Sequence, residues 1–62
     1  MRKPNRDQIY QDIETGELRV LRARSEFETC RGEWMAWGPN RLCIYIIADE
    51  FLSADYVYIG EL

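Results

Sequence analysis

The chain contains no histidine among its 62 residues. Histidine is the commonest general base in enzymes and the commonest metal ligand in proteins, so the usual centre of both kinds of site is missing. The sequence also lacks a nucleophile elbow, a glycine-rich phosphate loop and any cluster with metal-ligand spacing. We therefore predict that the protein is not an enzyme and that it holds no metal and no cofactor.

Cysteine is scarce, with only Cys30 and Cys43 in the chain. A hairpin that turns at residues 38–40 would place Cys43 opposite Met35 and Cys30 opposite Ala48, an offset of about 16 Å along the strands. A disulfide needs Cα atoms within about 7 Å of each other. We predict two free, partly buried thiols.

The sequence has no long hydrophobic segment. Its longest apolar run, Leu42 to Ala48, is much shorter than the roughly 20 residues that span a bilayer. No apolar run follows the basic start Met1-Arg2-Lys3, as it would in a secretory signal peptide. We expect a cytoplasmic protein with no membrane segment.

Positive charge is confined mainly to the first part of the chain. The net charge is −3, but residues 1–24 carry six bases against four acids, whereas residues 25–62 carry two bases against seven acids. An acidic chain lacks the overall attraction for phosphate on which nonspecific nucleic-acid binding depends. Only a local strip of basic residues would bind the phosphates of a nucleic acid.

A chain of this length forms one domain, and such a domain buries only about 60% of its unfolded surface. The chain contains two tryptophans, two phenylalanines and four tyrosines, which increase the buried apolar area because each can bury roughly 150–250 Å². Residues 1–7 are polar and include Pro4, so we predict a flexible basic arm there. Residues 8–62 then form a single small β-barrel domain.

The first part of this domain has two interpretations. Residues 8–13 and 18–25 can form two strands joined by a turn at residues 14–17, and Thr-Gly between such runs favours this hairpin. Residues 5–15 can instead form a short helix that stops at Gly16. In the second strand the apolar face switches at Val20–Leu21, which predicts a bulge or a strong bend.

The rest of the chain adds further strands. We predict a strand over residues 27–37 broken at Gly32, a strand over 41–48, a single helical turn after Asp49, and a strand over 56–62. This order predicts an all-β fold, a small SH3-like five-stranded barrel with one helical turn before the last strand. The alternative is an α+β domain with the N-terminal helix on a three- or four-stranded sheet. The expected core includes Leu42, Ile44, Ile46, Phe51, Leu52, Val57 and Ile59.

Aromatic and acidic side chains define the candidate partner-binding surface. If Val57 and Ile59 face the core, the alternation of a strand points Tyr56 and Tyr58 outward. The two tryptophans of WMAW lie on opposite faces of a regular strand, so one of them stays partly exposed, as interface hot spots often are. The candidate residues are Trp34, Trp37, Tyr45, Tyr56 and Tyr58, rimmed by Glu26, Glu28, Asp49, Glu50 and Asp55.

A basic strip supports an alternative, nucleic-acid binding. Its residues are Arg2, Lys3, Arg6, Arg19, Arg22 and Arg24. No aromatic residue interleaves with these bases, so the sequence does not show a stacking platform for single strands. We favour an explanation in which Arg22 and Arg24 pair across strands with the Glu26/Glu28 segment or with Asp12 and Glu14. Homodimerisation through the aromatic side chains of the last strand or through an edge strand is a third expectation, since small chains often need added burial.

Two segments, IYQDIETGELRVLRA and ADEFLSADYVYIGEL, carry a family resemblance. They resemble small uncharacterised proteins of tailed phages and prophages, which open with Y-x-D-x-x-T-G-E and close with an acidic and aromatic segment. The matching residues are Tyr10, Asp12, Thr15, Gly16, Glu17, Phe51, Tyr58 and Gly60. The resemblance implies a phage accessory protein that binds and modulates a host protein. Its acidic rim would steer it toward a basic surface, such as that of a nucleic-acid-processing enzyme.

Overall fold

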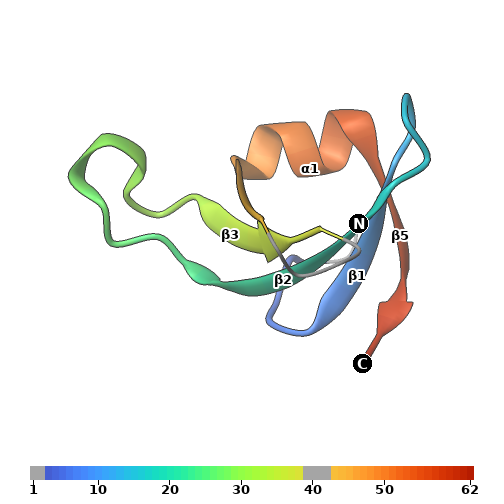
Figure 1. Cartoon of the computed structure of the whole chain (residues 1–62), viewed down its shortest axis with the longest axis horizontal. Helices are drawn as coiled ribbons and strands as arrows, with labels where there is room; N and C mark the ends of the chain where they lie inside the picture. Colours follow the sequence, from blue (N-terminus) through green and yellow to red (C-terminus); the bar gives the residue numbers. More distant parts are fainter. Residues whose placement is uncertain (1–2, 39–42) are drawn as a thin grey trace.

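The computed structural model describes residues 3–38 and 43–62. Within them the chain forms a mostly β fold, an antiparallel five-stranded sheet of order β4-β3-β2-β1-β5 with one short helix before the last strand (Figure 1). The elements are β1 (Gln8–Asp12), β2 (Leu18–Arg24), the 3₁₀ turn η1 (Glu28–Cys30), β3 (Trp34–Trp37), β4 (Ile44–Ile47), α1 (Asp49–Asp55) and β5 (Tyr56–Glu61).

The N-terminal hairpin is confirmed, and the alternative N-terminal helix is wrong. β1 pairs with β2, with Tyr10 opposite Arg19. Asp12 organises the turn, because its Oδ1 accepts hydrogen bonds from the backbone N–H groups of Glu14 and Thr15 at 2.8 and 3.1 Å. Gly16 then takes a φ of 78°, a left-handed conformation that glycine adopts without steric cost. Local turn chemistry therefore selects the hairpin.

The bulge predicted in the second strand is confirmed, slightly further along the chain. The β2–β3 register shifts between Leu21, which pairs with Ala36, and Ala23, which pairs with Met35. Arg22 is the extra residue of this bulge. It lies with Ala23 opposite Met35 of β3. As a result Leu21 is buried in the core, whereas Ala23, which would share its face in a regular strand, is exposed.

The predicted strand over residues 27–37 is only partly correct. Residues 28–30 form the 3₁₀ turn, and the strand begins at Trp34 after Gly32, whose φ is 87°. The predicted register of the next hairpin is wrong, because Met35 pairs with Ile46 instead of residue 43. Both thiols are free, with Cys30 half-buried and Cys43 exposed. Residues 41–42 of the predicted strand lie outside the described residues.

The predicted barrel and its single helical turn need correction. α1 spans seven residues, about two turns, and it crosses one side of the sheet between the β4 and β5 edges (Figure 1). The sheet is not closed into a barrel: in the described part of the chain, β4 and β5 form opposite edges and do not pair. A barrel closes only when its two edge strands pair with each other, and within the described residues β4 pairs with β3 alone and β5 with β1 alone. None of the described helical segments is long and apolar enough to cross a membrane.

The core lies between α1 and the sheet face that α1 covers, which we call the inner face. Its buried apolar residues are Tyr10, Leu21, Trp34, Ala36, Ile47 and Leu52, with Tyr56 and Tyr58 packed against them. The expected orientation of β5 is therefore wrong, since its tyrosines face inward while Val57 and Ile59 are 49% and 51% exposed. The rings of Tyr10 and Tyr58 meet edge to face with centroids 5.7 Å apart, which holds β5 in this orientation.

The other side of the sheet, the outer face, is apolar and bears no helix. Its most exposed apolar side chains are Leu18, Ile44, Ile46, Val57 and Ile59. Ile9, Val20, Met35 and Trp37 lie between them and are half-buried. Ile44 and Ile46 were expected in the core, as was Phe51 of α1, and all three are exposed instead. Leu42 lies outside the described residues.

Candidate functional site

The predicted partner-binding residues do not form one surface. Trp34 is buried in the core, whereas Trp37 lies on the outer face. Tyr56 and Tyr58 pack toward the core below α1, and Tyr45 lies on the inner face of β4. Glu26 and Glu28 belong to the β2–β3 connection, which extends away from β5 and α1 (Figure 1). The remaining rim residues, Asp49, Glu50 and Asp55, lie on α1.

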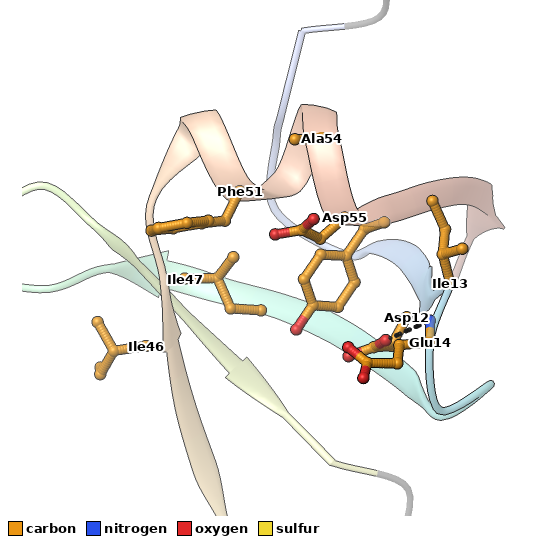
Figure 2. Close-up of a pocket in the computed structure, with 9 residues that line it drawn as sticks. Asp12, Ile13, Glu14, Ile46, Ile47, Phe51, Ala54 and Asp55 are labelled. Carbon is orange, nitrogen blue, oxygen red and sulfur yellow. Dashed lines mark hydrogen bonds between the residues drawn. The ribbon is translucent and has the colours of Figure 1, made fainter.

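An open cleft of about 410 Å³ lies beside α1 (Figure 2). We call it the acidic cleft. It is lined by Asp12, Ile13, Glu14, Ile46, Ile47, Phe51, Ala54, Asp55 and Tyr56.

The β1–β2 turn and α1 together build the acidic cleft. The backbone N–H of Ile13 donates to the carbonyl oxygen of Asp55 at 3.0 Å, which ties the turn to the end of α1. Figure 2 shows Phe51 and Ile47 at one end of the cleft, Asp12 and Glu14 at the other, and Asp55 between them. One wall is therefore apolar and the opposite end carries carboxylates.

Both ends of the cleft carry a large hydrophobic side chain that is open to solvent. Phe51 of the apolar wall is 53% exposed, and Ile13, which lies beside Asp12 and Glu14 at the other end, is 62% exposed (Figure 2). Of the carboxylates, Asp12 is already oriented by the two turn N–H groups that bind its Oδ1. Such a cleft suits a long aliphatic side chain with a cationic head, because lysine and arginine carry both parts.

Tyr56 connects the cleft with the core. Burial raises the pKa of its hydroxyl above the ordinary value of 10.0, and the nearby carboxylate of Asp12 raises it further. The positive charge of Arg19 acts in the opposite direction, because it favours the phenolate. The Tyr56 hydroxyl is therefore neutral at physiological pH.

Arg19 is a buried cation on the inner face, a feature that the sequence interpretation missed. Its guanidinium carbon lies 3.9 Å from the centre of the Tyr45 ring. Nη1 donates to the carbonyl oxygen of Leu18 at 2.9 Å, and Nη2 lies 3.4 Å from Oε2 of Glu17. Arg19 pairs with Tyr10 across the hairpin, so strand alternation was the only sequence signal for its burial.

A second groove of about 430 Å³ lies along another side of α1. It is lined by Pro4, Tyr10, Asp49, Glu50, Leu52, Ser53, Tyr56 and Tyr58. The three predicted rim acids of α1 therefore line different hollows. Asp55 lines the acidic cleft, whereas Asp49 and Glu50 line this groove. Tyr56 lines both.

The arginines of the predicted basic strip lie on both faces of the sheet. Arg22 lies 3.7 Å from the centre of the Trp37 ring on the outer face. Arg24 lies 4.3 Å from the Trp34 ring and donates from Nη1 to Oδ1 of Asp49 at 2.7 Å. Its acidic partner is thus on α1 and not among the residues expected.

The aromatic partners of the arginines come from β3 and β4, which are other strands of the sheet, so no linear pattern showed them. In the N-terminal segment, Lys3 is exposed and Arg6 lies 4.0 Å from the carboxylate of Asp7, while Arg2 is outside the described residues. This segment is held by hydrogen bonds, since Gln8 Nε2 donates to the Lys3 carbonyl oxygen at 3.2 Å.

Comparison with known proteins found no matching family model, no matching curated protein and no matching solved structure.

Proposed function

We propose that this protein is a small acidic protein-binding module whose acidic cleft receives a basic segment of a partner protein. The observation that carries the proposal is the combination within one cleft of exposed Phe51 and Ile13 with the carboxylates of Asp12, Glu14 and Asp55. Exposed apolar side chains next to charged ones are typical of protein interfaces. The net charge of −3 adds a long-range attraction for a basic surface.

The wider role that we propose is that of a phage or prophage accessory protein that modulates a host protein, such as a nucleic-acid-processing enzyme. The resemblance of its two end segments to small phage proteins supports this role, and so does the acidic surface beside α1. The strand order, with a helix before the last strand, supports an SH3-like arrangement that is open between β4 and β5.

Binding to a labelled peptide of alternating lysine and leucine, measured by fluorescence anisotropy, tests the cleft. We expect Asp55→Lys to weaken binding roughly tenfold or more, because it places a cation between the two ends of the cleft. Phe51→Ala should also weaken binding by removing the apolar wall. Added salt should weaken binding to the wild type.

Glu28→Lys is the matched control, since it changes the net charge by the same amount from the β2–β3 connection. It should change the affinity by no more than about twofold at moderate salt, where distant charges are screened. Equal losses in Asp55→Lys and Glu28→Lys would show that only net charge matters and would reject the cleft.

A further inference from the structure

The outer face of the sheet has the composition of a protein interior. Ile44 is 52% exposed on one edge strand and Val57 is 49% exposed on the other. An antiparallel sheet with one solvated face normally carries polar side chains there. The outward-facing strand residues described here include no acid, although the chain has 11.

The outer face and the acidic cleft differ in the charge of their side chains. The one cationic strand residue of the outer face in the described part of the chain, Arg22, stacks on the Trp37 ring at 3.7 Å. A basic partner would meet no carboxylate here, so the ligand proposed for the acidic cleft does not suit the outer face. Two identical outer faces, in contrast, meet without burying a carboxylate, and each arginine keeps its aromatic contact.

The size of the face suits a modest dimer. Five strands about 4.8 Å apart make a face roughly 24 Å wide, and strands of four to seven residues make it about 13–23 Å long. The face therefore covers roughly 300–550 Å², which is less than the roughly 800 Å² per partner of a standard interface and is in the range of weak complexes. Sheets pack face to face at about 10 Å, a distance that aliphatic side chains fill.

We propose that a second copy of this chain covers the outer face and forms a two-fold symmetric sheet-on-sheet dimer. The dimer gives a second apolar layer to a chain whose own core has only a few buried side chains. Because α1 lies on the inner face, the two acidic cleft surfaces point away from each other. The proposal does not depend on what those clefts bind.

Sedimentation equilibrium of the wild type across roughly 5–500 µM tests the proposal, with an expected dissociation constant on the order of 10 µM. Ile44→Lys and Val57→Lys should be monomeric over this range and keep the circular dichroism spectrum of the wild type. Both side chains are half exposed in the monomer, so lysine fits there. Phe51→Lys is the control, and it should remain dimeric because Phe51 lies on the α1 side.

Acrylamide quenching of tryptophan fluorescence gives a second measurement that needs no variant. Dilution of the wild type should increase quenching, because Trp37 becomes accessible while Trp34 stays in the core. A monomeric wild type at about 500 µM, or variants that associate as strongly as the wild type, would overturn the dimer. Peptide binding by monomeric Ile44→Lys would show that the acidic cleft functions independently, so the two proposals fail separately.

Discussion

Arginine–aromatic contacts dominate the β2 strand at the residue scale. Arg19, Arg22 and Arg24 lie over rings contributed by β4 and β3. Such contacts contribute about 0.5–1 kcal/mol when exposed and about 2 kcal/mol when desolvated. These side chains therefore link β2 with β3 and β4, and their guanidinium groups are already engaged in contacts within the protein.

Tyr56 makes stability depend on alkaline pH. Its folded-state pKa lies above the value of 10.0 that applies to the unfolded chain, so the folded state holds the phenol proton longer. Stability should therefore fall as pH rises from about 10 through the folded-state pKa, whereas Tyr56 contributes no pH dependence well below pH 10. Urea unfolding of the wild type and of Tyr56→Phe at a series of pH values from about 8 to 11 measures this effect.

Tyr56→Phe should show a shallower loss of stability above about pH 10, because it lacks the titrating proton. Any change in packing that follows the loss of the hydroxyl would displace the whole curve without changing this slope. Parallel curves for the two proteins above pH 10 would contradict the prediction.

At the scale of elements, α1 docks on the sheet through one fully buried side chain. Leu52 is 2% exposed and is the only buried residue of α1. The helix has seven residues and is too short to be stable without tertiary packing. Its apolar packing therefore depends mainly on Leu52, while the Ile13–Asp55 hydrogen bond and the Arg24–Asp49 ion pair hold its two ends.

Leu52→Ala should destabilise the protein by about 2–5 kcal/mol, because it removes buried methyl groups and leaves a cavity. A domain of this size has a total stability of only about 3–9 kcal/mol, so the variant should be largely unfolded on warming. Thermal unfolding followed by circular dichroism measures the loss. Phe51→Ala, on the exposed side of the same helix, should cost less than about 1 kcal/mol, and an equal cost for both would contradict the assignment of Leu52 as the anchor.

At the scale of the whole molecule, charge distribution argues against nucleic-acid binding. The bases of β2 are divided between the two faces of the sheet, and the chain is acidic overall. A tracking surface for phosphate needs clustered, available cations.

We expect no shift of a duplex or single-stranded oligonucleotide in gels at about 50 µM protein and low salt, where electrostatic binding is strongest. A clear shift that disappears with added salt would contradict this expectation. Loss of that shift in Arg22→Ala would then identify the outer face as the contact surface.

Features that depend on neighbouring residues were predictable from sequence. The turn after Asp12, the β1–β2 hairpin, the β2 bulge and the final strand all follow from local residue chemistry. For the candidate site, sequence reasoning found Asp55 and Tyr56. It did not associate them with Ile13 or Phe51, because the turn and α1 meet only after β5 pairs with β1.

The sequence alone determined a small, mostly β domain with an acidic surface, because strand periodicity, turn residues and charge are local properties. Only the tertiary structure decided which side of each strand faces the core. Register set that choice, since a shift of one residue exchanges the two faces of a strand. β5 thus turned Tyr56 and Tyr58 inward and left Val57 and Ile59 on an open apolar face, because the tyrosine rings fill the space below α1 and meet Tyr10.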